Sequence, residues 1–475
     1  MGQKVGSTLE TIQTVEPWYW RSLPLNNLTG SQVFAALFST EAIATLLESP
    51  GTANAEQLQL SRYSICAGSP RTVQNQSRLW TPTTGRILPF LGSLLKQSRV
   101  DNAQVAHLPF TGGWLGWLGY DLAWEIEQLP ELNQDTLPFP VAYWYEPECF
   151  AVLDHLAQTL WLAATDVEQL DHLERNLSGS TCAQDKLSFA PTAEPITFLT
   201  NREQYQNAVK QAKQYIQAGD IFQTNLSLRF QTTTTADSWL IYHQLQQINP
   251  SPFASYWRSP WGDVISCSPE RLVQLKDEQA QTRPIAGTRS RGKTTASDRL
   301  LAAELLANTK ERAEHIMLVD LERNDLGRVC QWGSVEVDEL LVIERYSHVM
   351  HLVSNVKGRL KQDLNAVDLI RGVFPGGTIT GCPKVRCLEI IEELEPVRRS
   401  LFYGSCGYLD QRGNLDLNIL IRTLLYVKPV DAELAQVYGQ VGAGIVADSD
   451  PGREWAESLH KAAAQIAALQ SPTSQ

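Results

Sequence analysis

Residues 310–328 read KERAEHIMLVDLERNDLGR, and this stretch carries the most informative pattern in the sequence. Apolar residues at helical spacing begin before it, near Ser297, and continue to Leu318, so we predict one helix through this region. Glu311 and Glu314 are three residues apart, and their carboxylates therefore project from one helix face about one turn apart. Acids at this spacing most often form only a solvated face, so the pair needs support from the rest of the chain.

A second pair of acids repeats this spacing near the C-terminus. Asp450 followed by proline is typical of a helix start, and we expect a helix from there toward Leu469. This helix carries Glu454 and Glu457, with Lys461 four residues beyond Glu457. Mg2+ prefers oxygen ligands and takes few of them from the protein, because substrate oxygens and water complete its coordination. Two such acid pairs therefore make a divalent-cation site a reasonable expectation.

Two glycine-rich segments could bring backbone amides close to an anion. Residues 374–384, FPGGTITGCPK, lead into an amphipathic segment, and exposed amides at a helix start bind anions. A carboxylate fits this segment better than a phosphate, because neither GxxxxGK[ST] nor GxGxxG is present. The segment Gly442–Gly444 would allow a similar approach. Taken alone, both segments are more often ordinary turns, and His351, in a strand-like run, is more often a core residue.

Composition limits the possible classes of protein. The 475 residues are 43% hydrophobic and 19% charged, which excludes a small binding module and global disorder. A net charge of -12 disfavours nucleic acid and acidic membranes as partners. We find no run of about 18 uncharged apolar residues, so no membrane span is predicted. Eight cysteines without CxxC spacing favour the reducing cytoplasm over a zinc site. We expect a small-molecule ligand or a protein partner.

The segment at residues 178–194, SGSTCAQDKLSFAPTAE, is small and polar and predicts a boundary between two parts of the chain. Before it, short apolar runs alternate with turn signals, as strands do. We therefore predict an N-terminal domain at residues 1–190 and a second domain at residues 198–470.

The second part begins with a clear helix signal. Thr200 as the cap and Glu203 three residues later match a capping box, and Gly219 ends the apolar periodicity. A strand is expected next, at residues 221–230.

Five separated blocks resemble the chorismate-utilising enzymes, the family that includes the large subunits of anthranilate synthase and aminodeoxychorismate synthase. The blocks are RPIAGTR (283–289), residues 310–328, YSHVMHLVS (346–354), GTITGCPK (377–384) and VGAGIVADSDP (441–451). They extend over residues 200–469, and a Gly-Gly-Trp segment at 112–114 extends the likeness to the first part. The resemblance implies an α+β fold in which two antiparallel sheets pack as a sandwich wrapped by helices.

The resemblance also implies roles for individual residues. Glu314 and Glu457 would hold Mg2+, which in turn binds the ring carboxylate of chorismate. Glu311 would be the general acid for the departing 4-hydroxyl, with His351 assisting, and Glu270 matches a carboxylate assigned to aminodeoxychorismate enzymes. Residues expected to bind or line the substrate are Gly287, Thr288, Thr378, Arg422, Gly442, Ala443, Gly444, Glu454 and Lys461.

The nitrogen source is expected to lie outside this chain. We find no Cys-His-Glu amidotransferase pattern, and the family implies a separate glutaminase subunit that delivers ammonia. Gln223 occupies the place where water-using relatives carry a lysine base, so ammonia rather than water is the expected nucleophile.

Two aminating reactions remain open. Asn225, Leu326 and residues 249–255 look like aminodeoxychorismate synthase, which aminates C4 and keeps the enolpyruvyl group for folate synthesis. Ala286 looks like anthranilate synthase, which aminates C2 and releases pyruvate for tryptophan synthesis, because the other enzymes commonly place a nucleophilic lysine there. Phe402 replaces a frequent tyrosine and removes one hydroxyl expected beside the substrate. We favour the first reaction.

A second ligand site is also implied. The segment from Leu46 to Ser49 resembles a tryptophan-binding motif, and the pocket would be formed by Leu47, Glu48, Ser49, Pro252 and Phe253. Residues 46–49 could instead be a helix end with a polar stop before Pro50 and Gly51. A catalytically silent, tryptophan-binding or scaffold relative is the alternative from a different class, and the complete set of acids and cations disfavours it.

Overall fold

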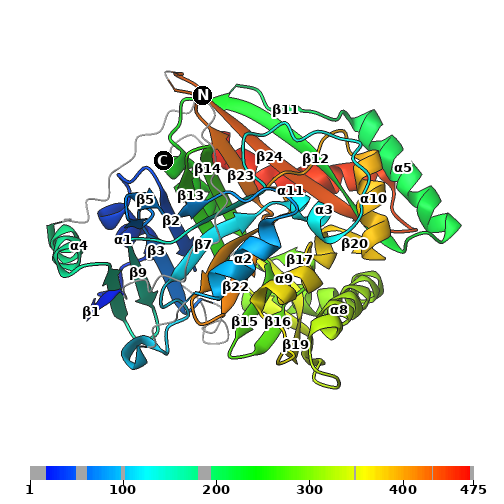
Figure 1. Cartoon of the computed structure of the whole chain (residues 1–475). Coiled ribbons are helices and arrows are strands. Elements are labelled where there is room, and N and C mark those ends of the chain that lie inside the picture. Colours follow the sequence, from blue (N-terminus) through cyan, green and yellow to red (C-terminus); the bar gives the residue numbers. More distant parts are fainter. Residues whose placement is uncertain are drawn as a thin grey trace.

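The computed structural model describes residues 18–49, 61–97, 102–179, 194–346, 349–430 and 432–470. Two large antiparallel sheets form its centre, with helices around them (Figure 1). This arrangement confirms the expected α+β sandwich. The predicted domain boundary falls almost entirely on residues 180–193, which lie outside the described residues.

The first sheet has twelve strands: β1 (Tyr19–Pro24), β2 (Ala44–Glu48), β3 (Tyr63–Ala67), β9 (Cys149–Asp154), β10 (Thr159–Ala164), β11 (Thr197–Phe198), β12 (Gln223–Thr234), β13 (Phe253–Ser259), β14 (Gly262–Ser268), β20 (Gly381–Cys382), β23 (Thr423–Val427) and β24 (Ala435–Ile445). Their order is β1-β10-β9-β3-β2-β13-β14-β23-β24-β12-β11, and β20 also pairs with β12.

The second sheet has ten strands: β6 (Leu79–Trp80), β7 (Gly113–Leu118), β8 (Ala142–Tyr145), β15 (Arg271–Lys276), β16 (Gln279–Thr282), β17 (Ile285–Ser290), β18 (Glu336–Arg345), β19 (Val349–Arg359), β21 (Ser405–Asp410) and β22 (Leu415–Asn418). Their order is β17-β19-β16-β15-β22-β21-β7-β8-β6, and β18 also pairs with β19. A small separate sheet joins β4 (Thr72–Val73) to β5 (Gln76–Ser77).

The α-helices are α1 (Gly30–Leu37), α2 (Ile87–Leu95), α3 (Ala123–Ile126), α4 (Val167–Gly179), α5 (Arg202–Ala218), α6 (Ser238–Ile248), α7 (Thr295–Ala307), α8 (Thr309–Val329), α9 (Ala366–Val373), α10 (Lys384–Leu394) and α11 (Pro451–Gln470). Short 3-10 helices are η2 (Ala103–Val105), η3 (Tyr120–Leu122) and η4 (Gly377–Ile379). Among the residues that the structure describes, no helix is long and apolar enough to cross a membrane.

Both sheets combine strands from before and after residues 180–193. In the first sheet β2 pairs with β13, and in the second sheet β7 pairs with β21. The Gly-Gly-Trp segment forms the start of β7, a buried strand as expected.

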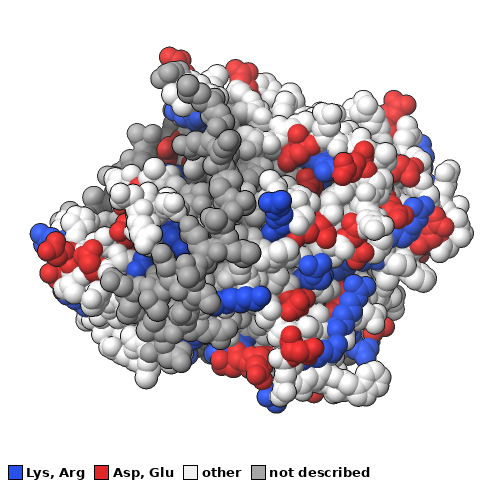
Figure 2. All heavy atoms as spheres, viewed as in Figure 1, with Lys and Arg blue, Asp and Glu red and all other residues white. Residues whose placement is uncertain are grey.

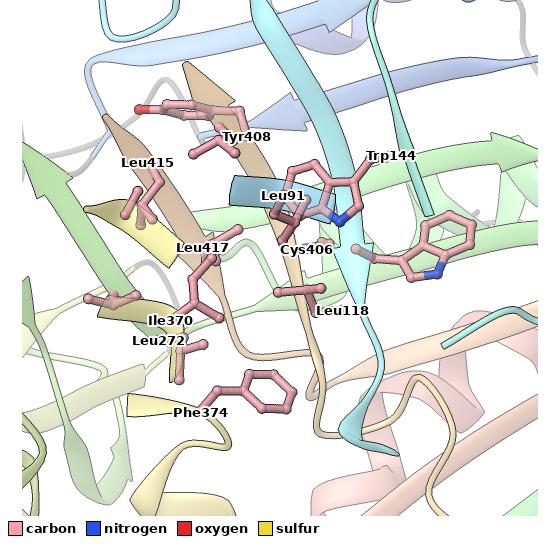
Figure 3. Close-up of a cluster of buried hydrophobic side chains, with 14 of the residues drawn as sticks. Leu91, Leu118, Trp144, Leu272, Ile370, Phe374, Cys406, Tyr408, Leu415 and Leu417 are labelled. Carbon is pink, nitrogen blue, oxygen red and sulfur yellow. The ribbon is translucent and has the colours of Figure 1, made fainter. Parts of the chain in front are cut away.

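Two hydrophobic cores enclose the first sheet, because side chains alternate between its two faces. Ile65 of β3 belongs to the core between the sheets, whereas the adjacent Cys66 belongs to the core under the helices α1, α4, α5, α6 and α11. The same cluster continues on the far face of the second sheet, where Trp144 of β8 and Leu91 of α2 lie (Figure 3). Between the sheets, the Tyr145 hydroxyl of β8 donates to Thr45 of β2 at 2.8 Å, and Trp117 of β7 packs against Trp257 of β13. These contacts join the two sheets.

Helix α5 begins one residue later than expected. The Asn201 side chain accepts from the Gln204 amide at 2.9 Å, and the Gln204 side chain accepts from the Asn201 amide at 2.9 Å. The prediction of a cap at Thr200 is therefore wrong. A capping box is present, but it begins one residue later, at Asn201. Gly219 ends the helix with φ of 84°, as the sequence predicts.

The single helix predicted through residues 297–318 is instead two helices. Asn308 separates α7 from α8, and its side-chain oxygen accepts from the amides of Lys310 at 3.1 Å and Glu311 at 3.2 Å. An Asn in this position satisfies backbone donors at a new helix start. Glu311 therefore lies in the first turn of α8, where a carboxylate is favoured by the helix dipole.

Acidic and basic side chains are interspersed on the described part of the face in Figure 2. On helix α10, for example, Arg386 contacts Asp220 at 3.0 Å and Glu389 at 2.7 Å. Exposed pairs of this kind add little stability.

Candidate active site

A bulge between β17 and β19 brings several expected site residues together. Ala286 pairs with Leu352 and Thr288 with His351, so Gly287 is an extra residue on β17. Gly287 has φ of 64°, a left-handed conformation that glycine adopts without strain. The Thr288 hydroxyl oxygen lies 3.0 Å from His351 Nδ1. The bulge therefore turns Thr288 toward the imidazole.

Burial keeps His351 uncharged at neutral pH. Burial lowers the pKa of its imidazole to about 4, and the Arg422 guanidinium adds to this effect. A backbone hydrogen bond at Gly287 acts in the opposite direction. A neutral imidazole can donate one hydrogen bond and accept another, so His351 can orient a hydroxyl group.

Only one of the two carboxylate oxygens of Glu311 has hydrogen-bond partners. Its Oε1 accepts from Arg289 at 2.9 Å and lies 3.3 Å from the Asn308 side-chain amide. Its Oε2 is buried and has no hydrogen-bond partner. A methyl group on Gly287 would overlap this oxygen, so glycine leaves the space that it occupies.

Carboxylates from α8 and α11 interact across the site. Burial raises the pKa of Glu314, and the nearby charge of Glu457 raises it further. The Lys310 ammonium lies 3.6 Å from Glu314, and the Lys461 ammonium lies 2.8 Å from Glu457. Although burial opposes it, Lys461 brings the pKa of Glu457 below its usual value.

This donor set fits Mg2+ only with ligands from elsewhere. Among the described residues, no group of three or more His, Cys, Asp or Glu side chains could hold a metal ion alone. Glu314 and Glu457 nevertheless supply two charged oxygen donors close enough to influence one another. Mg2+ commonly takes one or two protein carboxylates and completes its coordination with substrate oxygens and water. The two residues therefore fit such an ion when a substrate is present.

Gly442 and Gly444 lie where β24 has a free edge. The pairing of β24 with β23 ends at Gly439, whereas β12 continues beside β24 as far as Ile445. Lys461 of α11 donates to the Gly442 carbonyl at 3.1 Å, which places its ammonium beside this edge. The edge of residues 442–444 that faces away from β12 therefore has no strand beside it and lies next to a cation. Ala443 between the glycines is buried in the helix-side core.

Two amide side chains of β12 cover the glycines. If Gly442 had a side chain, its Cβ would lie 2.9 Å from Asn225 Oδ1. A Cβ on Gly444 would lie 2.7 Å from Gln223 Nε2. The side-chain oxygens of both residues are buried and have no hydrogen-bond partner. A buried acceptor without a donor is costly, so these oxygens are suited to a ligand that donates hydrogen bonds.

Glu270 is the most strongly perturbed carboxyl group of the expected site. Burial raises its pKa to about 7, although the Thr378 hydroxyl, a backbone amide at Ile285 and the Arg422 guanidinium oppose this rise. Thr378 belongs to η4, and Arg422 has φ of 53° directly before β23. A non-glycine residue in this conformation is strained, and such strain is common at functional sites. Burial lowers the pKa of Arg422, which also interacts with Glu457.

The expected site residues thus fall into two connected groups. Glu270, Thr378, Arg422 and His351 interact at the second sheet, and Glu314, Glu454, Glu457 and Lys461 interact between α8 and α11. The interaction of Arg422 with both Glu270 and Glu457 links them.

Three neighbouring residues were missed by the sequence analysis. Arg289 and Asn308 hold Glu311, and Tyr403 interacts with Arg422. Phe402 packs under the Arg229 guanidinium, 5.6 Å from its ring centre, so the adjacent Tyr403 is the aromatic residue whose hydroxyl influences this site. The signal for Asn308 was present, because an Asn three residues before a Glu is a capping pattern.

The five residues expected to bind tryptophan line one separate cavity. It has a volume of about 120 Å3 and is also lined by Tyr63, Ile65, Pro109, Ala254, Arg271, Gln274, Cys406, Gly407, Tyr408, Asp416 and Asn418. Leu47 and Glu48 belong to strand β2, so the alternative of a helix end is wrong.

Glu48 is already saturated with hydrogen bonds. Its carboxylate accepts from the Ser31 amide at 2.7 Å, the Ser31 hydroxyl at 2.6 Å, Tyr242 at 2.9 Å and Gln246 at 2.6 Å. Glu48 thus joins the start of α1 to α6 and supports the cavity wall.

Comparison with known proteins identifies the family. The chorismate binding enzymes match residues 46–467. An anthranilate synthase component I-like protein of Synechocystis is 62% identical over 97% of this chain and 93% of its own length. Aminodeoxychorismate synthase component 1 of Bacillus subtilis is 47% identical over 76% of this chain and 77% of its own length. The structure of anthranilate synthase component I from Streptococcus pneumoniae has a TM-score of 0.73 at 31% identity and covers 85% of this chain and 92% of that chain.

The chain belongs to the chorismate-binding enzymes. Within that family it falls in the group formed by aminodeoxychorismate synthase and anthranilate synthase component I.

Proposed function

We propose that this protein aminates chorismate in a Mg2+-dependent reaction with glutamine-derived ammonia and forms 4-amino-4-deoxychorismate for 4-aminobenzoate and folate synthesis. The observation that carries the proposal is the pair of buried, unpartnered oxygens on Gln223 and Asn225. Amide oxygens accept N–H groups of ammonia, but they are too weakly basic to activate water. Ammonia needs no base before it attacks, because its lone pair is already free.

The choice of C4 rests on Asn225 and on two other parts of the sequence. Asn225, Leu326 and residues 249–255 look like those of aminodeoxychorismate synthase, and the Bacillus subtilis relative carries that name. In this reaction the 4-hydroxyl leaves as water and an amino group takes its place, while the enolpyruvyl group stays.

Anthranilate synthase activity is the second candidate, and Ala286 favours it. This residue pairs with Leu352 beside the bulge, and its methyl side chain cannot attack C2 to form a covalent intermediate. If C4 amination occurs here, ammonia must therefore enter without a lysine adduct at this position.

Glu314 and Glu457 would hold Mg2+. The bound ion would supply positive charge against the ring carboxylate of chorismate. Lys461, Arg422 and the free edge at residues 442–444 would bind the carboxylates of the substrate. Glu454 and Lys310 would adjust the charge around the metal carboxylates, as their influence on the pKa of Glu314 supports.

Glu270 is the better candidate for the proton donor to the 4-hydroxyl. Its raised pKa of about 7 keeps a proton on it near neutral pH. Glu311, in contrast, accepts from Arg289 through Oε1 at 2.9 Å, and this contact fixes its orientation. We therefore propose that Glu270 donates the proton, that neutral His351 orients the leaving hydroxyl, and that Glu311 acts as an oriented carboxylate.

A glutamine amidotransferase subunit would supply the ammonia. The Bacillus subtilis and Streptococcus pneumoniae relatives are each named as component I, which supports a two-component enzyme.

We propose the cytoplasm as the compartment of this protein, and the seven described cysteines, which are all free thiols, are compatible with it. Tryptophan is the proposed ligand of the cavity beside Leu47 and Ser49.

The proposal can be tested by identifying the product. The purified chain would be incubated with chorismate, Mg2+ and ammonium at mildly alkaline pH, and fluorescence and a coupled lyase assay would be recorded. A product that yields 4-aminobenzoate only after lyase is added is the expected result. Anthranilate and pyruvate formed without lyase would establish the second candidate and overturn the first.

A further inference from the structure

Arg289 of β17 connects three elements beside the proposed site. Its Nη1 donates to Glu311 Oε1 of α8 at 2.9 Å and to the Thr288 carbonyl at 3.0 Å. Its Nε donates to Glu304 of α7 at 3.2 Å. The side chains of Arg289 and Glu311 are only 22% and 21% exposed, so this contact is sheltered from solvent, whereas Glu304 is 62% exposed.

The two oxygens of Glu311 have different environments. Arg289 and the Asn308 amide both approach Oε1, whereas Oε2 is buried without a partner in the space left by Gly287. A carboxylate held through one oxygen can rotate little, so the direction of the other oxygen is fixed. That direction is toward Gly287 in the bulge of β17, beside Thr288, which pairs with His351 of β19.

We propose that Arg289 is a positioning residue of the aminating site, which holds Glu311 through Oε1 so that Oε2 faces the substrate. This inference rests on the proposed function. Arginine suits the role because its planar group presents Nε to Glu304 and Nη1 to Glu311 at the same time. Lysine has one ammonium group and could keep the charge but not both contacts.

The test is a double-mutant cycle between Arg289 and Glu311. The variants Arg289→Met, Glu311→Gln and the double variant would be assayed with chorismate, Mg2+ and saturating ammonium. We expect Arg289→Met to lower kcat by about 10- to 100-fold, with less than about a threefold change in the KM for chorismate, because a lost contact to a charged group acts in the transition state. In the Glu311→Gln background the same change should lower kcat by less than about threefold.

A lysine variant and a matched control separate positioning from folding. Arg289→Lys should recover part of the lost kcat, because it restores a cation beside Glu311. Arg299→Met, which removes an exposed arginine from α7, should leave both constants unchanged. The melting temperature of each variant shows whether it is folded, and Arg289→Lys replaces Arg289→Met in the cycle if the latter unfolds.

Several results would overturn the inference. An unchanged kcat in Arg289→Met would do so. The same fold-loss of kcat with Glu311 and in the Glu311→Gln background would also do so. A rise in KM alone would assign Arg289 to substrate binding instead. If the unmodified protein forms no aminated product, the proposed function fails first, which distinguishes that failure from an active enzyme insensitive to Arg289.

Discussion

Thr288 and His351 face one another across the bulged pair of β17 and β19, with the hydroxyl oxygen 3.0 Å from Nδ1. The Thr288 hydroxyl therefore occupies Nδ1 of an imidazole that is uncharged at neutral pH, and Nε2 is the ring nitrogen left for the substrate.

Loss of the Thr288 hydroxyl should therefore slow the reaction. We expect Thr288→Val to lower kcat/KM for chorismate by about tenfold, the value of one hydrogen bond, because the imidazole loses its orientation. Thr288→Ser is the matched control, since it keeps the hydroxyl. Steady-state kinetics would measure both, and equal activity of all three proteins would exclude a role for the Thr288 hydroxyl.

The pH dependence should report Glu270. If the protonated carboxyl donates to the leaving hydroxyl, activity is present below its pKa of about 7 and falls as pH rises through that value. We expect an alkaline limb near pH 7 in kcat/KM for chorismate, measured at constant free ammonia. Glu270→Gln should be nearly inactive and lack this limb. A limb that survives in the Gln variant would belong to another group.

Glu314→Gln and Glu457→Gln should abolish Mg2+-dependent turnover while the fold remains. Both side chains are partly exposed, at 32% and 52%, so the amides are tolerated structurally. Mg2+ and chorismate together should raise the melting temperature of the unmodified protein, because a ligand that binds only the folded state stabilises it. Neither variant should show this shift. Full activity in either would contradict the metal assignment, and no shift in the unmodified protein would favour a silent scaffold.

A buried ion pair should be important for stability. Lys384 at the start of α10 contacts Asp325 of α8 at 2.6 Å and the Val373 carbonyl at 2.8 Å. Lys384→Met leaves the Asp325 charge without a partner, and we expect a loss of about 3–5 kcal/mol in the free energy of unfolding. Arg323→Met, which breaks an exposed pair with Asp320, should cost less than about 1 kcal/mol. Urea unfolding would compare them, and similar losses would refute the expectation.

His315 should make the protein less stable in mild acid. It is fully buried, its Nε2 lies 2.6 Å from the Ser354 hydroxyl, and burial lowers its pKa from 6.5 to about 4. Between these values the unfolded chain binds a proton that the folded chain does not, so stability falls as pH falls from 6.5 to 4. His315→Gln removes this titration, and the plot of unfolding free energy against pH should become flatter in that window. An unchanged slope would exclude the effect.

Periodic patterns in the sequence predicted the elements that carry the site. The spacing of Glu311 and Glu314 places both acids on α8, and the Asp450-Pro signal marks the start of α11, as observed. The break at Asn308 could have been recognised from its capping pattern, but the apolar spacing on both sides concealed it. Local signals of this kind depend on neighbouring residues only.

Contacts between distant elements could not be predicted in this way. The Arg289–Glu311 pair joins β17 to α8, and its existence depends on the bulge at Gly287, which is a property of strand register. Likewise, the raised pKa of Glu270 results from burial by other elements. Nothing in the residues beside Glu270 distinguishes it from an exposed acid.

The shared sheets have a consequence for synthesis of the chain on the ribosome. Strand β7, with its buried tryptophans, meets its neighbour β21 only after residue 410 has been made. Until then one edge of a highly apolar strand is unpaired, and such edges promote aggregation. Assembly of the native sheets must therefore wait for nearly the whole polypeptide, and a chain truncated before β21 should depend on chaperones to remain in solution.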